Sequence, residues 1–307
     1  MNPVLVFLGF GVFLTCALGM LASGIDRKVT ARLQYRVGPP LWQPFIDLVK
    51  FFGKENLVPR GAVRALFFGA PLFGLASVFA VSTILWMNAV DPAQSFGGDL
   101  IVVLYFLVMP SISLMMGGFA SRNPYASLGA SREMKLILAY ELPFLLSMMV
   151  PVMKAGMHIR LGEILLHQAE AGATIGSVSG ALAFIVGLLT IQAKLGLVPF
   201  DIAEAESEIV SGPLIEYSGV GLGLFRLMKI TLLFVLPFFL VILYMGGISW
   251  HGWGLLWSFL KFLSVVVLIV VIRNTNPRVR IDQAVRFFWG PVTGLAALAV
   301  GLAWAGW

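Results

Sequence analysis

Residues 230–248, ITLLFVLPFFLVILYMGGI, form a run of 19 residues without a charged side chain. An apolar segment of about 20 residues is what an α-helix needs to cross a hydrocarbon layer of roughly 30 Å. Similar runs recur along all 307 residues, of which 59% are hydrophobic and only 12% charged. Soluble domains have about 25% charged residues, and the strands of membrane β-barrels alternate in short segments. The sequence therefore predicts an all-α, polytopic membrane protein with a single membrane domain over residues 1–307.

Apolar runs between charged interruptions predict eight transmembrane helices. They cover residues 3–23, 65–90, 100–120, 134–154, 173–194, 222–248, 254–272 and 287–306. We interpret the first run as a retained helix, because a signal peptide has a basic segment before its apolar run and this chain has none. An even number of spans places both termini on the same side of the membrane.

The basic residues are distributed unevenly between the two sides that these spans define. The segments after the first, third, fifth and seventh spans, with short flanks, hold 18 of the 21 Lys and Arg residues. Cytoplasmic loops carry an excess of Lys and Arg, so both termini are expected outside the cytoplasmic membrane. Tryptophans are enriched at membrane interfaces. Six of the eight fall near the outer interface, namely Trp86, Trp250, Trp253, Trp257, Trp304 and Trp307.

Residues that bind metals or redox groups are rare in this chain. Because Cys16 is the one cysteine, an internal disulfide and a cysteine-ligated iron–sulfur cluster are excluded. His158, His167 and His251 fall in or beside loops, which disfavours a haem held by two histidines inside the membrane. The sequence has no Walker or dinucleotide-binding motif. We expect no metal or cofactor in this chain, and topology explains the net charge of +6 better than nucleic-acid binding does.

The segment between the first two spans contains an amphipathic stripe with helical spacing. Its apolar positions are Phe45, Leu48, Val49 and Phe52, and its charged positions are Asp47, Lys50 and Lys54. A helix this short and this charged is expected to lie in the plane of the membrane interface. One interpretation is a surface anchor with lysines near lipid phosphates. The other is a lateral gate to a cavity between helices, formed by Gln43, Phe45, Asp47, Lys50 and Lys54.

The loop after the fifth predicted span concentrates acidic residues. They are Asp201, Glu204, Glu206 and Glu208, with Glu216 soon after. On a continuous helix, Glu204 and Glu208 would share one face at i, i+4 and repel each other. The loop is then either an acidic docking surface for a soluble partner or a set of coupled carboxylates. In the second case their proximity raises some pKa values, so that they can pass protons.

Two charged residues fall inside predicted spans. Glu141 lies in an apolar run, where a carboxylate is expected to be protonated, paired or beside water, and where it indicates a functional site. The alternative is a structural carboxylate that reaches back to Arg132 or Lys135. Two roles remain for Lys261. Its side chain either extends the ammonium group to the membrane interface or forms part of an ion path.

Three motifs follow one another in the order of a known family. They are Arg36-Val-Gly-Pro with Gln43-Pro-Phe-Ile-Asp-Leu-Val-Lys within residues 32–55, Pro199-Phe-Asp-Ile-Ala-Glu-Ala-Glu-Ser-Glu with Glu216-Tyr, and Asn276-Pro-Arg-Val-Arg-Ile-Asp-Gln. Together they resemble the H-type subunit of complex I, which is subunit one of NADH dehydrogenase in mitochondria. The resemblance covers nearly the whole chain and implies the same count of eight helices.

A fourth motif favours one branch of that family. Gly129-Ala-Ser-Arg-Glu is similar to the version in energy-converting, membrane-bound nickel–iron hydrogenases, whereas complex I subunits more often have Gly-Ala-Leu-Arg. Pro40 stands where complex I members commonly have glycine. We therefore expect a respiratory hydrogenase-like complex. The alternatives are the quinone-site subunit of NADH:quinone oxidoreductase and the same module in a sulfur-reducing complex. A stand-alone transporter is disfavoured because the sequence shows no internal repeat.

The resemblance implies a non-catalytic anchor subunit of an oxidoreductase complex that couples electron transfer to proton or sodium translocation. Its partners would be a peripheral iron–sulfur subunit, a hydrogenase-like large subunit, antiporter-like and small membrane subunits, and membrane lipid. Iron–sulfur clusters and a nickel–iron centre are expected in those partners, and quinone only in the complex I alternative. The expected ion path comprises Glu141, Asp201, Glu204, Glu206, Glu208, Glu216 and Lys261.

Arginines in the loops predicted to be cytoplasmic complete the set of candidate residues. Guanidinium groups make bidentate pairs with carboxylates, so these arginines are expected to dock the peripheral arm or to balance the acidic loop. They are Arg32, Arg36, Arg122, Arg132, Arg278 and Arg280, with Asp282 beside them. The alternative is that these arginines only determine the membrane topology.

Overall fold

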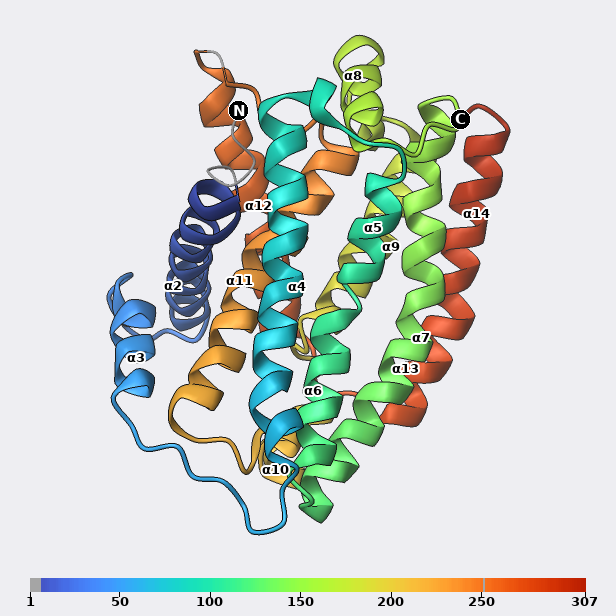
Figure 1. The fold of residues 1–307 in the computed structure, drawn as a ribbon. Coiled ribbons are helices and arrows are strands. Elements are labelled where there is room, and N and C mark those ends of the chain that lie inside the picture. The colour runs from blue at the N-terminus through green and yellow to red at the C-terminus, as the bar shows by residue number, and fades with distance from the viewer. Residues whose placement is uncertain (1–6, 251) are drawn as a thin grey trace.

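Long apolar helices make up most of the protein (Figure 1). The computed structural model describes residues 7–250 and 252–307, so residues 3–6 of the first predicted span and His251 lie outside the described residues. Within those ranges, seven helical segments are long and apolar enough to cross a membrane: Phe7–Leu33, Arg64–Val90, Asp99–Ala120, Pro124–Lys154, Gly219–Tyr244, Gly254–Thr275 and Ile281–Trp304. The predicted all-α, multi-pass class is confirmed.

The elements follow the predicted order. The long helices are α2 (Thr15–Leu33), preceded by a π-helical segment (Phe7–Leu14), then α4 (Arg64–Val90), α5 (Asp99–Phe106), α6 (Met109–Ala120), α7 (Pro124–Lys154), α9 (Val178–Lys194), α11 (Gly219–Tyr244), α12 (Gly254–Thr275), α13 (Ile281–Phe287), a second π-helical segment (Phe288–Val292) and α14 (Thr293–Trp304). Shorter helices are α3 (Gln43–Phe52), α8 (Leu161–Ala171) and α10 (Glu206–Ile209). Single 3-10 turns cover Pro92–Gln94, Thr174–Gly176, Ile202–Glu204 and Gly212–Leu214.

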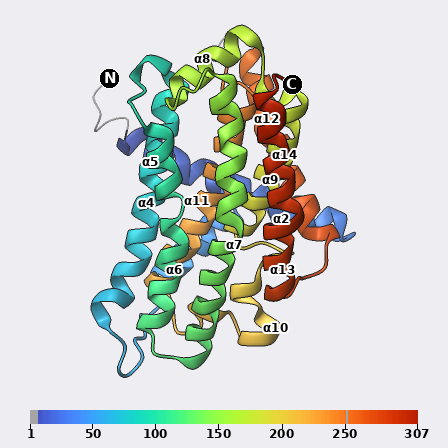
Figure 2. The same ribbon diagram turned by 90° about the vertical axis from the view of Figure 1, so that its right-hand side faces the viewer.

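The fifth predicted span is shorter than expected. The segment 173–177 is mostly a 3-10 turn, and α9 has only 17 residues. A helix of that length rises about 26 Å, at the short limit for crossing a hydrocarbon layer. Figure 2 shows α9 beside α7 and α14, and all three helices contact one another. Seven segments of the described residues therefore have the length to cross a membrane, and α9 is an additional, shorter apolar helix.

Two helices extend well beyond their predicted spans. Helix α2 continues to Leu33 and α7 begins at Pro124, each about ten residues further than the apolar runs. Charged side chains in these extensions are paired: Asp26 on α2 accepts from Arg273 on α12, and Arg132 on α7 pairs with Glu208. The third crossing breaks between α5 and α6, because Pro110 has no N–H to donate to the carbonyl of Phe106.

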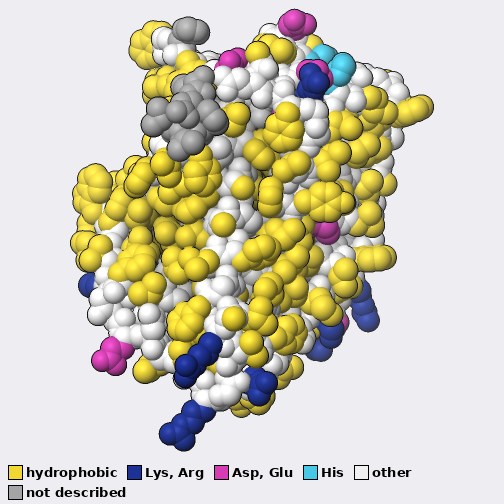
Figure 3. Space-filling model, in the orientation of Figure 1, with side chains coloured by type: hydrophobic (Ala, Val, Ile, Leu, Met, Phe, Trp, Pro, Cys, Tyr) yellow, Lys and Arg dark blue, Asp and Glu magenta, His cyan; other side chains and the backbone are white. Residues whose placement is uncertain are grey.

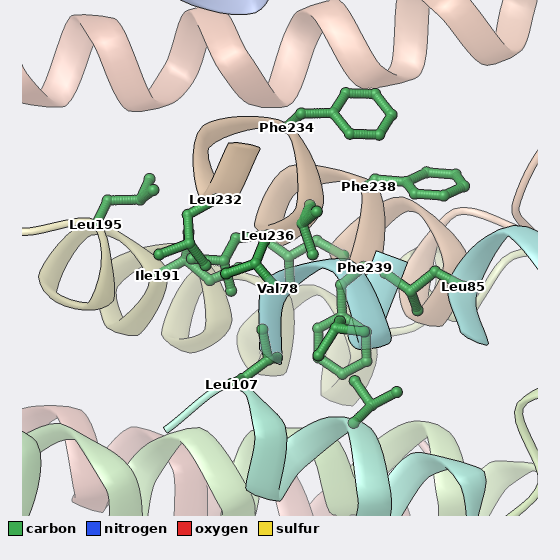
Figure 4. Close-up of a cluster of buried hydrophobic side chains, with 14 of the residues drawn as sticks. Val78, Leu85, Leu107, Ile191, Leu195, Leu232, Phe234, Leu236, Phe238 and Phe239 are labelled. Atoms are coloured by element: carbon green, nitrogen blue, oxygen red, sulfur yellow. The ribbon is translucent and has the colours of Figure 1, made fainter. Parts of the chain in front are cut away.

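Helix α11 is the central helix of the bundle, and 83% of its apolar stretch is buried. It packs against α2 and α4. Figure 4 shows part of this core, where Leu236 and Phe239 of α11 meet Val78 of α4 and Ile191 of α9. Inside a membrane, such contacts stabilise the bundle through close van der Waals packing between helices. The outer helices α12 and α14 bury much less of their surface.

The bundle has two different ends. The C-terminus lies at the end that carries α8, whereas α3 and α10 lie toward the other end (Figure 1). In Figure 3 apolar side chains cover the middle of the visible face, and most of the visible Lys and Arg gather at the lower end. We define this lower end as the basic end. It contains the segments 34–42, 53–63, 121–123, 195–218 and 276–280.

Candidate functional site

A chamber of about 700 Å³ opens at the basic end, between α2, α11, α12 and the loops that follow α2 and α9. Ten of its 22 lining residues are charged, six basic and four acidic. They are Asp26, Arg27, Arg36, Asp201, Glu204, Glu206, Arg226, Lys229, Arg273 and Arg278. Most of the predicted loop acids therefore do face a cavity, together with basic residues that no sequence pattern connects to them.

Ion pairs connect the walls of the chamber. Arg273 Nη1 lies 2.7 Å from Asp26 Oδ2 and joins α12 to α2. Arg278 Nη2 lies 2.7 Å from Asp201 Oδ2. A third pair joins Lys229 on α11 to Glu204 in the loop after α9. Each pair links segments that are distant in sequence, so the charges of the chamber hold its walls together as well as lining it.

Asp201 is the loop acid with the most deeply buried side chain, with 13% exposed. Burial raises the pKa of this carboxyl above its ordinary value, although the Arg278 guanidinium acts in the opposite direction. Its side chain lies at the meeting point of the chamber and a smaller pocket further inside the bundle. Asp201 thus holds its proton to a higher pH than an exposed aspartate does.

No continuous helix joins Glu204 and Glu208, so the two residues do not share a helix face. Glu204 ends a 3-10 turn, and Ala205 has φ −56° and ψ 99°, which separates it from the four-residue helix α10. Glu204 consequently turns toward Lys229 and the chamber. Glu208 turns the other way and lies 2.5 Å from Arg132 of α7, with 55% of its side chain exposed. The backbone break keeps the two carboxylates from repelling each other.

A small inner pocket continues from the chamber into the bundle. Its space of about 20 Å³ is enough for about one water molecule. It shares Asp201, Glu204 and Lys229 with the chamber and adds Glu133 and Lys194. Glu133, on α7, is only 5% exposed.

The surroundings of Glu133 make it part of the same electrostatic group. Its side chain hydrogen-bonds to Ser111 and lies within the fields of Glu204, Lys229 and Lys194. Ser111 Oγ is also 3.3 Å from the hydroxyl of Tyr140. The role of Glu133 was not predicted from the sequence, although the residue belongs to the motif that starts at Gly129. The signal that could have revealed it was an acid at the beginning of an apolar run.

Glu141 is paired inside the bundle. Its Oε2 lies 2.8 Å from Nζ of Lys194, whose side chain is 2% exposed. The same Nζ lies 4.9 Å and 4.5 Å from the ring centroids of Tyr140 and Phe144. The alternative pairing with Arg132 or Lys135 is therefore wrong: Glu141 reaches across to α9 instead of back along α7. Chamber, inner pocket and this pair form one series of charged groups.

Lys261 and Glu216 lie away from this series, and Glu206 lies at its edge. Lys261 donates a 2.6 Å hydrogen bond to the carbonyl of Met245, just after α11 and far from the chamber. Glu216 accepts a 2.5 Å hydrogen bond from Asn123 at the surface of the basic end. Glu206 is exposed and lies on the rim of the chamber. Within residues 7–250 and 252–307, no three His, Cys, Asp or Glu side chains are grouped as metal ligands.

The predicted docking residues cluster at the basic end in different environments. Arg36 and Arg278 line the chamber, and Arg132 holds Glu208. Arg280 pairs with Asp282 at 3.3 Å on the surface. Arg32 and Arg122 are exposed. Beside Arg36, Tyr35 is 100% exposed and Val37 91% exposed, which makes this loop an apolar and basic surface.

The predicted amphipathic helix is present as α3. It packs against α2 and α11 at the basic end. Asp47 accepts hydrogen bonds from Arg27 at 2.7 Å and from Gln43 at 2.9 Å, so the polar edge faces the bundle. Val49 and Phe52 face outward and are 70% and 47% exposed. Phe45 is partly buried and contacts the ring of Trp42.

The fold and this site define a multi-pass membrane protein with a charged chamber at one end and a buried series of ionisable groups leading from it. The chain belongs to the NADH dehydrogenase family, whose model matches residues 5–304. The H-type resemblance found in the sequence is thereby confirmed.

Known proteins are similar over nearly the full chain. The H-type subunit of NADH-quinone oxidoreductase from Geobacillus kaustophilus is 32% identical, over 98% of this chain and 94% of the relative. The Bacillus mycoides protein of the same description is 33% identical over 92% and 89% of the two chains. Among solved structures, a chain of the membrane-bound sulfane sulfur reductase, an archaeal respiratory membrane complex, has a TM-score of 0.89 and 29% identity. That match covers 99% of this chain and 100% of the other.

Proposed function

We propose that this chain is the membrane subunit of a respiratory oxidoreductase complex in which charge movements in the chamber drive ion translocation. The cytoplasmic arm of the complex docks on the basic end and carries the electron-transfer groups. In this orientation both termini face outward, because the 18 basic residues on the other side of the membrane mark it as cytoplasmic. Related chains of quinone- and sulfur-reducing complexes share the fold.

One observation carries the coupling role. Ionisable side chains follow one another from the chamber to the middle of the bundle: Asp201, Glu204, Lys229, Glu133, Lys194 and Glu141. These groups are close enough for the charge of each to affect the ionisation of the next, as the electrostatic effect of Glu204 and Lys194 on Glu133 indicates. A charge change at the chamber therefore changes the proton affinity of the next group inward. A mainly structural core would not contain such a series, since buried charges are costly.

Docking of the arm is supported by the composition of the basic end. Arg32, Arg36 and Arg280 are exposed there, and guanidinium groups suit carboxylates of a partner. The neighbouring Tyr35 and Val37 are almost fully exposed. Exposed apolar side chains surrounded by charged ones are typical of protein–protein contacts. The same surface opens into the chamber through Arg36 and Val37.

The nature of the chamber favours the hydrogenase-like branch over quinone binding. Nearly half of its lining residues are charged, whereas small-molecule sites are predominantly apolar with a few polar groups. The Gly129-Ala-Ser-Arg-Glu motif points to the same branch. The second candidate, a quinone site, is supported by the chamber volume of about 700 Å³, which is within the range of ligand pockets.

Identification of the partner subunits tests the proposal. The complex is purified from membranes through a tag on this chain, its subunits are identified by mass spectrometry, and its nickel and iron contents are measured. We expect an iron–sulfur subunit and a nickel-containing large subunit in equal amounts with this chain. An NADH-oxidising flavoprotein would establish the quinone alternative. A chain that purifies alone, with full ion transport, would contradict the anchor role.

A further inference from the structure

A second pocket lies between α3, α2 and α11 and is separate from the inner pocket. It has a volume of about 260 Å³, slightly below the roughly 300 Å³ at which small-molecule sites begin. Four basic side chains line it: Arg27, Lys50, Lys54 and Arg226. We call it the α3 pocket. Lys50 and Lys54 belong to the predicted amphipathic segment, and none of the roles described above combines them with Arg226.

The α3 pocket has a net charge of +3, from four basic residues and one acid. The acid, Asp47, is bound by Arg27 and Gln43. Burial opposes ionisation of Asp47, but these hydrogen bonds hold the pKa of Asp47 below its ordinary value, so the carboxylate is charged. Lys50, Lys54 and Arg226 take part in none of the ion pairs among the described residues. Three cations thus face a pocket whose own acid is already engaged by Arg27.

The position of α3 places these cations at a defined depth. Ile46, Val49 and Phe52 form the outward edge of the helix and are 48%, 70% and 47% exposed. An amphipathic helix with such an edge lies in the membrane interface, with its apolar side among the upper parts of the acyl chains. The opposite edge, which carries Asp47 and Lys50, then lies at the level of the lipid phosphates, and Lys54 follows just after the end of the helix.

We propose that the α3 pocket binds the phosphate headgroup of an anionic phospholipid, whose acyl chains lie against the outward edge of α3. Basic pockets between helices on the cytoplasmic side are suited to such headgroups. Phosphate fits the charge of the pocket, and the apolar edge of α3 selects a lipid over a soluble anion. The α3 pocket also shares Arg27, Arg226 and Ile230 with the chamber. A bound headgroup therefore lies next to the chamber, beside Arg27 and Arg226, which line both spaces.

The test uses the complete complex in lipid nanodiscs that contain phosphatidylglycerol and phosphatidylcholine. Native mass spectrometry counts the lipids of each kind that remain bound. The variant is Lys50→Gln with Lys54→Gln, which removes two cations that do not line the chamber. The matched control is Lys28→Gln with Arg60→Gln, two exposed basic residues outside the α3 pocket. Subunit stoichiometry in the same spectra reports whether each variant assembles.

A cation near the membrane surface contributes about a fivefold factor to the affinity for an anionic lipid, so the double variant should bind phosphatidylglycerol about 25-fold more weakly. It should lose one tightly bound phosphatidylglycerol per complex, with phosphatidylcholine unchanged, and the control pair should keep that lipid. Equal retention in the double variant, or equal loss in the control pair, would overturn the proposal. Release of the lipid from the wild type by excess inorganic phosphate would assign the α3 pocket to a soluble anion instead.

Discussion

Nζ of Lys194 lies 2.8 Å from Oε2 of Glu141, and the lysine side chain is 2% exposed. The pair joins α9 to α7 in a part of the bundle where Tyr140 and Phe144 surround the ammonium group. The buried ammonium and the partly exposed carboxylate attract each other but lose hydration, so such a pair contributes little net stability. Its value is that each charge fixes the ionisation of the other. The pair is therefore suited to respond to a change at the neighbouring Glu133.

Breaking this pair on one side should destabilise the protein more than removing both charges. Glu141→Gln leaves the buried ammonium of Lys194 without its partner, at a cost of about 3–5 kcal/mol. Lys194→Met leaves the carboxylate of Glu141, which is 22% exposed, and should cost less. The double variant removes both charges and should recover most of that loss. The measurement is the thermal unfolding midpoint of the detergent-solubilised complex. Glu163→Gln, in a partly exposed cluster with His158 and Arg160, serves as the control and should change little. Additive losses in the double variant would show that the two charges are not coupled.

Asp201 should give the complex a distinctive pH dependence. Since burial raises the pKa of Asp201, the folded state holds this proton more tightly than the unfolded state. Its contribution to stability is complete below the ordinary carboxyl pKa of about 4 and is lost as the pH rises through the raised value. The unfolding midpoint of the wild type, relative to Asp201→Asn, should therefore fall as the pH increases from about 4. A difference that grows with pH would mean that the Arg278 ion pair dominates instead.

Glu133→Gln should interrupt ion movement without preventing assembly. The amide keeps the shape of the side chain and can still hydrogen-bond to Ser111, but it cannot bind or release a proton. We expect turnover by the peripheral arm to persist or to slow, with ion uptake into inverted vesicles reduced at least tenfold. The control is Glu170→Gln, an exposed acid at the end of α8. Normal uptake in Glu133→Gln would remove this residue from the path.

The orientation can be tested by thiol labelling in intact cells. In a Cys16→Ala background, a cysteine at Ala171 should react with a membrane-impermeant reagent added outside, and a cysteine at Leu57 should not. Both positions are exposed, and they lie at opposite ends of the bundle. Permeabilised cells provide the control, because both cysteines should then react. The reverse pattern would place the chamber on the outer side of the membrane.

Local sequence patterns were sufficient to predict several features of the fold and the site. Apolar runs predict the crossing helices, and the stripe around Leu48 predicts α3. The loop acids from Asp201 to Glu206 also proved to line a cavity. Each of these follows from residues close together in the chain, whose spacing is visible without a structure.

The features that depend on distant segments could not be predicted in the same way. Asp26 and Arg273 are 247 residues apart in sequence, and Glu141 and Lys194 are 53 apart. No periodicity connects such positions, so Lys194 was not recognised as the partner of Glu141. Glu204 and Glu208 lie on different sides of the loop for a local reason, since the backbone at Ala205 leaves the helical region.

The central claim is that acids facing the chamber carry coupled charge, whereas acids on the outer surface of the same loop do not. Glu204 and Glu208 form a matched pair for this test, because each is ion-paired and they are four residues apart. An exposed ion pair contributes only about 0–1 kcal/mol, so Glu208→Gln should leave function nearly unchanged.

The decisive measurement is ion uptake per electron transferred by inverted membrane vesicles, with subunit stoichiometry determined on the same preparation. With the arm fully assembled in both variants, Glu204→Gln should lower this ratio at least tenfold and Glu208→Gln should keep the wild-type ratio. Equal ratios in both variants, or a loss in Glu204→Gln that is accounted for by a missing arm, would contradict the coupling role of the chamber.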